Sequence, residues 1–157
     1  MKQKIITLIT VIAVIFTMSV PAFAGTYNSN TTTKTEYYAD GSYAVIETTV
    51  TQEPITAFAA SSTKTADIKY TYYNSNRKAA WDFTLKGTFS YNGTSAKAAK
   101  ASTSYNIYVT GWKCTDKAGT VSGATAKGTG TFKYNSGLTK NISLGLKCSA
   151  KGTISEA

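Results

Sequence analysis

The sequence predicts an all-β fold: a single antiparallel β-sandwich of about seven to nine strands, immunoglobulin-like in architecture. Apolar and polar residues alternate with a period of two along most of the chain after residue 33, as they do in strands with one buried face. Turn-forming pairs such as Asp40-Gly41 and Asn92-Gly93 separate these runs, and no helical period is present after residue 25. The immunoglobulin likeness concerns architecture only, because no tryptophan lies between the two cysteines. The alternative architecture is a small β-barrel.

A first hairpin is predicted where residues 33–39 and 42–51 flank Asp40-Gly41. Asp-Gly is a favoured two-residue hairpin turn, and the second run is rich in β-branched residues, which favour strands. Residues 52–65 contain a proline and a stretch of alanine, serine and threonine. They are predicted to connect the two sheets.

The strongest strand signal covers residues 80–91. Aromatic and aliphatic residues alternate there with polar ones, so one face is predicted to be core and the other solvated. A shorter strand is predicted over 68–73. Asn92-Gly93 then turns the chain into a weak strand over 94–103, whose alanine, lysine and serine content is typical of a sheet edge.

The last part of the chain is predicted to hold three more strands, over residues 105–114, 121–134 and 138–150. The last two are joined by the turn residues 135–137 and form a hairpin. Alternation in the final strand places Cys148 on its inner face.

Residues 1–24 are predicted to be a cleaved signal peptide. Lys2 and Lys4 form a charged start, a mostly apolar stretch follows, and the small residues up to Ala24 fit a signal peptidase site. The alternative is a retained membrane helix, but the apolar stretch is shorter than the roughly 20 residues needed to span a bilayer. Cleavage makes the protein secreted and exposes residues 25–33, which are polar and predicted to be a flexible N-terminal arm.

The remaining residues, 34–157, are predicted to form one β-sandwich domain. They include both cysteines, Cys114 and Cys148, and in an exported chain such a pair most simply forms one disulfide. The alternative is a reactive thiol. It is less favoured, because neither cysteine belongs to a C-x-x-C motif or lies beside a histidine.

Positive charge is concentrated in the second half of the chain. Residues 25–85 carry five basic and six acidic side chains, a net charge of −1, whereas residues 86–157 carry ten lysines against two acidic side chains, a net charge of +8. A cationic surface raises the local concentration of anionic cell-wall polymers, acidic glycans or anionic membrane surfaces. The alternative is that these lysines keep a β-protein soluble and block edge-to-edge pairing.

Six lysines of this half are candidates for one binding face. Three occupy outward positions of predicted strands and are expected to converge on one sheet surface: Lys86, Lys133 and Lys147. Three more would extend that surface: Lys97, Lys100 and Lys140.

Tyrosine is the second functional signal, since eleven tyrosines and two tryptophans exceed what the core of one domain needs. Tyr37-Tyr38 and Tyr72-Tyr73 are adjacent pairs within predicted strands, so one member of each pair should point outward. An exposed ring can stack on a sugar or anchor a protein interface, and Tyr72 and Tyr73 are therefore added to the candidate binding face. The plain structural alternative is that tyrosine is a good strand former.

Several kinds of chemistry have no support in this sequence. The chain has no histidine, so Ser-His-Asp and Cys-His sites cannot form, and no group of residues has the spacing of zinc ligands. Nothing in the sequence brings two carboxylates together as a glycosidase requires. Arg77 is the only arginine, which disfavours nucleic-acid recognition. We therefore expect no enzymatic activity, no cofactor and no metal.

These observations predict a secreted, non-catalytic binding module that associates with a cell surface through a lysine-rich sheet face. The expected partner is an anionic cell-wall polymer or glycan, or else a membrane surface. Two alternatives belong to other functional classes. One is a membrane-active, bacteriocin-like toxin in which residues 94–112 form an inserting hairpin, and the other is an interaction or inhibitor domain that uses residues 52–65.

Overall fold

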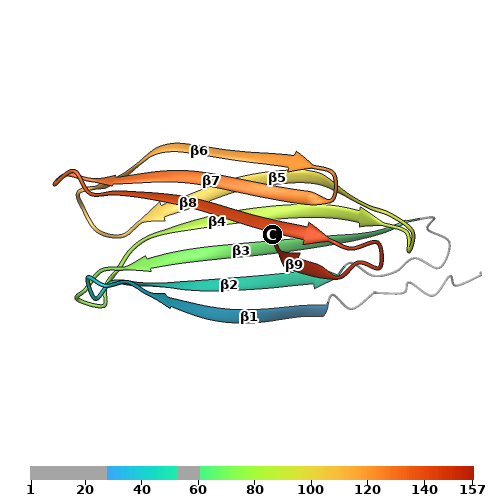
Figure 1. Ribbon diagram of the computed structural model, residues 1–157, viewed down its shortest axis with the longest axis horizontal. Helices are drawn as coiled ribbons and strands as arrows, with labels where there is room; N and C mark the ends of the chain where they lie inside the picture. Colours follow the sequence, from blue (N-terminus) through green and yellow to red (C-terminus); the bar gives the residue numbers. More distant parts are fainter. Residues whose placement is uncertain (1–27, 53–60) are drawn as a thin grey trace, which may run out of the picture.

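The computed structural model describes residues 28–52 and 61–157, which form an all-β protein. They make nine strands in two antiparallel sheets, which lie one above the other (Figure 1). Within these ranges no helix is long and apolar enough to cross a membrane. The predicted signal peptide, residues 1–24, and most of the predicted 52–65 connection lie outside the described residues. The prediction that this segment joins the two sheets is wrong, because the strands on either side of it, Tyr43–Gln52 and Ser62–Tyr73, pair within one sheet.

The first sheet, called sheet A, contains five strands in chain order. They are β1 (Asn28–Tyr37), β2 (Tyr43–Gln52), β3 (Ser62–Tyr73), β4 (Ala79–Tyr91) and β5 (Ala96–Ile107). Each strand pairs antiparallel with the next one along the chain. The alternation of the sequence therefore gives sheet A one apolar face and one polar face.

The second sheet, called sheet B, contains four strands, again in chain order. They are β6 (Trp112–Ser122), β7 (Thr125–Tyr134), β8 (Thr139–Cys148) and β9 (Ile154–Glu156). Immunoglobulin domains instead use Greek-key connections that pass between their sheets. The likeness to them therefore extends to the two antiparallel sheets and not to the connections.

The core lies between the sheets and is centred on Trp81 of β4. Its ring stacks on Phe132 of β7, with centroids 3.9 Å apart and an angle of 3° between the planes. Tyr70 and Tyr72 of β3 also stack on Trp81, with centroid distances of 5.6 and 5.3 Å. The core face predicted for residues 80–91 is confirmed, because the aromatic and aliphatic side chains that alternate from residue 81 to residue 89 are fully buried.

Four hairpin loops share one hydrogen-bond pattern, which fixes strand register. In each loop the backbone N–H of the first residue donates to the carbonyl of the residue four positions later. The carbonyl of the first residue accepts a hydrogen bond from the N–H of the residue three positions later. These loops span residues 38–42, 74–78, 134–138 and 149–153. The residue before the last has a left-handed φ: 77° at Gly41, 59° at Arg77, 93° at Gly137 and 81° at Gly152. Three-residue hairpin loops commonly end on a left-handed residue, usually glycine.

The register of the first hairpin differs from the prediction. Asp40-Gly41 was expected to form a two-residue turn, but the loop between the last paired residues has three residues, 39–41. As a result Tyr37 lies directly opposite Tyr43. The extra residue changes which β2 side chains share a face with those of β1.

The strand predicted over residues 105–114 is wrong. β5 continues to Ile107 and β6 begins at Trp112, so residues 108–111 carry the chain from sheet A to sheet B. The backbone N–H groups of residues 108 and 109 both donate to the carbonyl of Ala80, at 2.9 and 3.1 Å. These bonds tie the start of the crossing segment to β4 of sheet A.

The prediction of a flexible arm over residues 25–33 is wrong from residue 28 onward. β1 begins at Asn28 and pairs with β2 along its whole length, with Thr31 opposite Thr49. The two threonine hydroxyls are 2.8 Å apart and hydrogen-bonded. Backbone pairing holds this polar segment in the sheet, and a search for apolar alternation cannot detect such an edge strand.

The predicted disulfide between Cys114 and Cys148 is wrong, because both cysteines are free. Cys114 of β6 pairs with Phe132 of β7, and Phe132 pairs with Lys140 of β8. Cys148 lies 148 − 140 = 8 residues further along β8, which is about 26 Å at the usual rise of a strand. A disulfide needs Cα atoms within about 7 Å, so the register keeps these two residues far apart.

Candidate functional site

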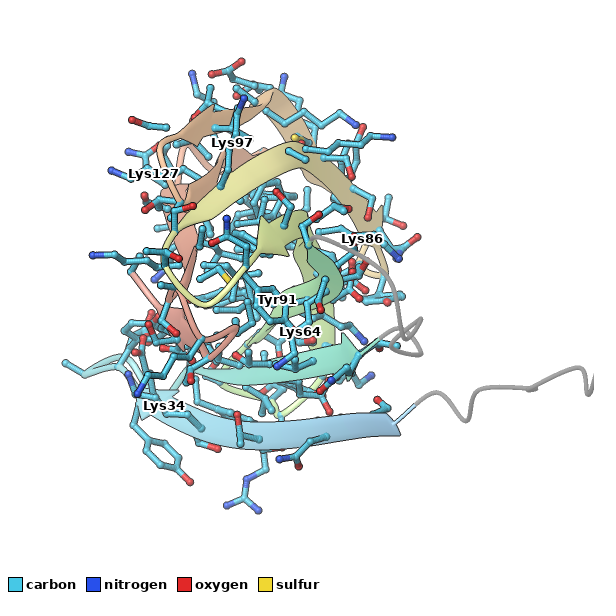
Figure 2. All side chains as sticks on the ribbon, turned by 90° about the vertical axis from the view of Figure 1, so that its right-hand side faces the viewer. Lys34, Lys64, Lys86, Tyr91, Lys97 and Lys127 are labelled. Atoms are coloured by element: carbon cyan, nitrogen blue, oxygen red, sulfur yellow. The ribbon has the colours of Figure 1, made fainter. Side chains whose placement is uncertain are left out.

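The six predicted lysines do not form a single surface. Lys86 lies on β4 of sheet A, whereas Lys133 and Lys147 lie on β7 and β8 of sheet B. Their outward directions were predicted correctly from alternation, and all three are exposed. However, the outer faces of two stacked sheets point in opposite directions. In Figure 2, Lys86 of sheet A and Lys127, an exposed lysine of β7 in sheet B, lie on opposite sides of the molecule.

The three lysines expected to extend the surface are also dispersed. Lys97 and Lys100 are exposed on β5, the edge strand of sheet A. Lys140 is half-buried, and its ammonium group lies 4.6 Å from the ring centroid of Tyr38 and 5.0 Å from that of Tyr72. This lysine therefore packs over aromatic rings at the gap between the sheets instead of joining an outer face.

Four exposed lysines nevertheless gather on the outer face of sheet B, which we call the sheet B lysine face. They are Lys113 of β6, Lys127 and Lys133 of β7, and Lys147 of β8. Lys113 lies directly opposite Lys133 in the pairing of β6 with β7. The exposed carboxylate of Asp116 belongs to the same face, which leaves three net positive charges, 4 − 1 = 3.

The ion pairs of the described residues all lie on sheet A. They join Lys34 to Glu36 at 2.8 Å, Lys69 to Glu47 at 4.0 Å and Lys86 to Asp67 at 3.9 Å. Three of the lysines of sheet A therefore lie beside carboxylates on the same sheet. Those of the sheet B lysine face take part in no such pair within the ranges the structure describes.

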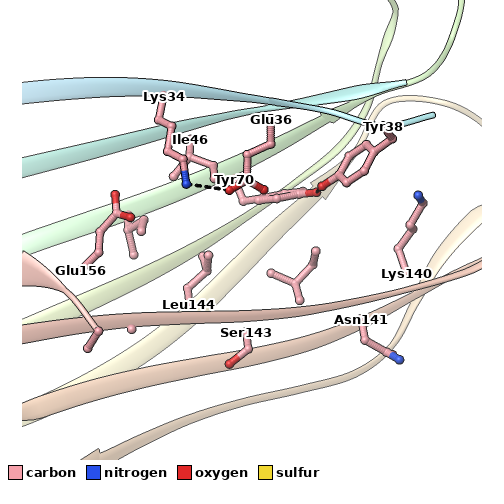
Figure 3. Close-up of a pocket in the computed structure, with 14 residues that line it drawn as sticks. Lys34, Glu36, Tyr38, Ile46, Tyr70, Lys140, Asn141, Ser143, Leu144 and Glu156 are labelled. Atoms are coloured by element: carbon pink, nitrogen blue, oxygen red, sulfur yellow. Dashed lines mark hydrogen bonds and ion pairs between the residues drawn. The ribbon is translucent and has the colours of Figure 1, made fainter. Parts of the chain in front are cut away.

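A groove of about 360 Å³ opens between β8 and the inner face of β1 to β3 (Figure 3). It exists because β9 pairs only with residues 146–148, so sheet B is short where β1 and β2 extend. Its side-chain charges balance, with Lys34 and Lys140 against Glu36 and Glu156.

The groove is closed at one side by a pair of tyrosines. The hydroxyls of Tyr38 and Tyr70 are 2.5 Å apart and form a hydrogen bond. Burial raises the pKa of Tyr70 well above its ordinary value of 10.0, and the bond to Tyr38 raises it further. The phenol therefore stays neutral and acts here as a packing and hydrogen-bonding group.

A row of tyrosines crosses the outer face of sheet A at the end that carries the β1–β2 and β3–β4 loops. Tyr37, Tyr43 and Tyr73 are direct cross-strand neighbours on β1, β2 and β3. The rings of Tyr43 and Tyr73 stack with centroids 4.6 Å apart, and those of Tyr37 and Tyr43 are 5.9 Å apart. Tyr37 is 81% exposed, so its ring is open to solvent.

Beside this row lies a second pocket, of about 500 Å³, that we call the Tyr37 pocket. It is lined by Thr35, Tyr37, Gly41, Tyr43 and Arg77. Gly41 and Arg77 belong to the two neighbouring hairpin loops, and the ideal Cβ position of Gly41 lies 3.8 Å from the Cβ of Ser75. The loops therefore place an aromatic surface and a guanidinium group around one hollow.

In each predicted tyrosine pair, the two side chains point to opposite faces of sheet A, as strand alternation requires. Tyr73 lies in the outer row, whereas Tyr72 is 3% exposed and belongs to the core. Tyr43 and Arg77 were not among the predicted site residues. The pairing of Tyr37 with Tyr43 follows only from the three-residue loop, and nothing in the sequence brings Arg77 next to them.

Among the described residues, the two thiols and the buried carboxylate of Asp82 are the remaining titratable groups with distinct surroundings. Burial raises the pKa of both cysteine thiols, which lowers the amount of nucleophilic thiolate at neutral pH. Asp82 is buried, and its carboxylate accepts hydrogen bonds from Asn106 and from the hydroxyl of Tyr108. Over the described part of the chain, no three His, Cys, Asp or Glu side chains lie close enough to hold a metal ion.

Comparisons with known proteins add no functional indication. No protein-family model, no curated protein and no solved structure matches this chain at a significant level. The functional assignment therefore rests on the residues and their geometry.

Proposed function

We propose that this protein is a secreted, non-catalytic binding module that associates with an anionic extracellular polymer, such as a cell-wall polymer or an acidic glycan. The binding surface is the sheet B lysine face. The observation that carries the proposal is the set of four exposed lysines on three adjacent strands, opposed by one carboxylate.

The geometry of this face favours a polymer over an isolated ion. Neighbouring strands lie about 4.8 Å apart and their side chains repeat every second residue, so the ammonium groups form a spaced array. An anionic polymer can contact several of them at once. The combined attraction is strong at low salt and weakens as ions screen it.

One pair of lysines gives further support. Lys113 and Lys133 lie directly opposite each other across β6 and β7, an arrangement that destabilises a sheet because the charges repel. A bound anion relieves this repulsion. The same strain serves no purpose if the lysines act only to keep the protein soluble.

The membrane-active alternative receives less support. Residues 94–112 do not form a hairpin of their own, because β5 pairs with β4 while β6 belongs to the other sheet. Insertion would require β5 to leave its pairing along the whole of β4. The inhibitor alternative depends on residues 52–65, most of which lie outside the described residues.

We also infer that the two sheets form a closed β-sandwich. The support is the burial of Trp81, Phe83 and Phe132 between them, together with the close approach of β7 to β4. An ideal Cβ on Gly128 of β7 would lie 3.1 Å from the Cβ of Leu85. Slow amide exchange along β4 and β7 alike would test this inference, and rapid exchange in either strand would contradict it.

The test of function is co-sedimentation of the secreted protein with bacterial cell walls that carry anionic polymers, over a range of salt concentrations. A variant with Lys113, Lys127, Lys133 and Lys147 all changed to Gln should bind at least tenfold more weakly at low salt, with a flatter salt dependence. The matched control changes Lys69, Lys86, Lys97 and Lys100 to Gln. It removes the same charge from sheet A and should bind nearly as well as the parent protein.

Two results would count against the proposal. Equal losses in both variants would mean that net charge matters and the sheet B lysine face does not. Unchanged binding in the sheet B variant would make its lysines a solubility device. Anionic vesicles loaded with dye provide a parallel assay, in which leakage would favour the membrane-active alternative.

A further inference from the structure

Arg77 occupies a backbone position that three equivalent loops give to glycine. The four loops make the same pair of hydrogen bonds, and the left-handed residue is Gly41, Gly137 or Gly152 in the others. At Arg77 φ is 59°, a conformation that is uncommon for residues other than glycine, asparagine and aspartate. The loop geometry alone would therefore favour glycine at this position.

The Arg77 side chain has no evident structural role that compensates for this strain. It is exposed, and it is absent from the three ion pairs of the described residues. The loop is held instead by Asn74, whose side-chain Oδ1 accepts the N–H of Lys78 at 3.0 Å. Strained residues of this kind cluster at binding sites, where the side chain serves the ligand.

The immediate surroundings of Arg77 have the features of a binding site. Arg77 lines the Tyr37 pocket together with the exposed ring of Tyr37 and the hydroxyl-bearing Thr35. Tyr43 is held in place by its stack on Tyr73, which fixes the aromatic wall before any ligand arrives. The pocket thus combines an open ring, a fixed ring and a planar cation.

We propose that the Tyr37 pocket binds a carboxylate-bearing sugar, a uronic acid unit of an acidic glycan. The apolar C–H face of the sugar ring packs on Tyr37, and the carboxylate receives two parallel N–H donors from the Arg77 guanidinium. Thr35 lies within the same pocket and supplies a hydroxyl for the sugar's own hydroxyl groups.

A sugar fits this pocket better than a phosphate group or a fatty chain. A free phosphate would use Arg77 but would leave the aromatic rings without a role, and a fatty chain would leave the guanidinium unpaired. This inference does not depend on the sheet B lysine face, because the residues of the Tyr37 pocket lie on the opposite sheet.

The test measures binding of the whole protein by titration calorimetry. The probes are tetrasaccharides of galacturonate, glucuronate and mannuronate, each compared with the corresponding neutral hexose tetrasaccharide and with inorganic phosphate. We expect at least one acidic tetrasaccharide to bind, with its neutral counterpart and phosphate at least tenfold weaker. Arg77→Gly and Tyr37→Ser should each weaken that binding at least tenfold.

Both variants are expected to fold, because Tyr37 and Arg77 are exposed and glycine suits the backbone at position 77. A melting temperature equal to or above that of the parent protein would verify this for Arg77→Gly. The inference is overturned if none of the acidic tetrasaccharides binds at millimolar concentration, or if Arg77→Gly binds as well as the parent. It is also overturned if binding is lost on changing the four sheet B lysines to Gln while Arg77→Gly retains it.

Discussion

Arg77 shows how a single residue can oppose the preference of its own loop. A left-handed conformation costs a residue with a Cβ about 1 to 2 kcal/mol, whereas glycine adopts it freely but loses more entropy on folding. We expect Arg77→Gly to raise the free energy of unfolding by about 0.5 to 1 kcal/mol in urea denaturation. A protein that gains stability while losing ligand binding would identify the arginine as a functional residue.

The matched control for this prediction is Gly137→Ala in the equivalent loop of sheet B. The position has a φ of 93°, and an added Cβ would meet no atom within 4 Å. The substitution therefore changes only the conformational energy of the backbone. We expect a loss of about 1 kcal/mol. If Gly137→Ala were neutral, the loops would tolerate any residue, and the argument from Arg77 would lose its basis.

Tyr70 gives the protein a pH dependence in the alkaline range. Its pKa is raised in the folded state, first by burial and then by the hydrogen bond with Tyr38, whereas the unfolded chain ionises near 10.0. The resulting stability is present below the unfolded pKa and is lost as pH rises through and above it. Tyr108 contributes in the same direction, because its bond to Asp82 and its partial burial raise its pKa.

We therefore expect thermal stability to fall steeply above about pH 10 and the fall to be shallower in Tyr70→Phe. At pH 7 the variant should lose about 1 kcal/mol, because the hydroxyl of Tyr38 loses its partner. Thermal melts monitored by circular dichroism from pH 7 to pH 11 measure both effects. An identical pH profile in the variant would show that Tyr70 is not the responsible group.

The two cysteine thiols are expected to differ in their reactivity. Cys148 is 1% exposed and Cys114 is half-buried, and burial raises the pKa of both. In native protein we expect Cys114 to react slowly with Ellman's reagent and Cys148 to react more slowly still, with both reacting quickly in denaturant. Reducing agent should leave the melting temperature unchanged, whereas a drop on reduction would reveal a disulfide.

At the level of elements, the stack of Trp81 on Phe132 joins β4 to β7 and thereby sheet A to sheet B. Both side chains are fully buried, so shortening either one leaves a cavity that packed strands cannot easily fill. Phe132→Ala is expected to cost about 3 to 5 kcal/mol, measured by chemical denaturation. Phe132→Leu keeps most of the volume and should cost clearly less; equal losses would mean that the ring stack contributes little.

The predictability of the strands depends on whether one of their faces is buried. β4 has an apolar residue at every second position, and its limits were predicted to within a residue. β1 carries polar residues on both faces, so its first six residues were assigned to a flexible arm. The edge strand is held by backbone hydrogen bonds, which leave no mark on side-chain periodicity.

Loop length was the other source of error at this scale. Asp-Gly is typical of two-residue turns, yet Asp40 lies within a three-residue loop in which its carboxylate accepts the N–H of Ser42 at 3.0 Å. The shift of one residue brings Tyr37 opposite Tyr43. The Tyr37 pocket could therefore not be predicted from the sequence, although one outward tyrosine in each of the pairs 37–38 and 72–73 could.

The whole molecule carries its charge asymmetrically. Sheet A mixes acidic and basic residues and contains all three ion pairs of the described residues, whereas the outer face of sheet B has four lysines and one carboxylate. Alternation in the sequence correctly indicated which lysines point outward. It could not show that Lys86 and Lys133 belong to different sheets, because sheet membership depends on pairings between distant segments.

This asymmetry predicts opposite responses to reversing one lysine on each sheet. Lys113→Glu replaces a repulsive pair with an attractive one, because Lys133 lies directly opposite. We expect it to raise stability by about 0.5 kcal/mol at low salt and to weaken polymer binding. In the parent protein Lys86 forms an ion pair with Asp67 at 3.9 Å. Lys86→Glu replaces this attraction with repulsion between two carboxylates and should lower the free energy of unfolding by a similar amount.

Salt distinguishes these effects from changes in strand propensity, because both substitutions introduce glutamate at an exposed strand position. Added salt should reduce the difference between each variant and the parent protein, since screening acts on attraction and repulsion alike. The measurement is the melting temperature of the three proteins at low and high ionic strength. Shifts of the same sign in both variants, unaffected by salt, would mean that Lys113 and Lys133 do not repel each other, and this repulsion would no longer support an anion-binding face.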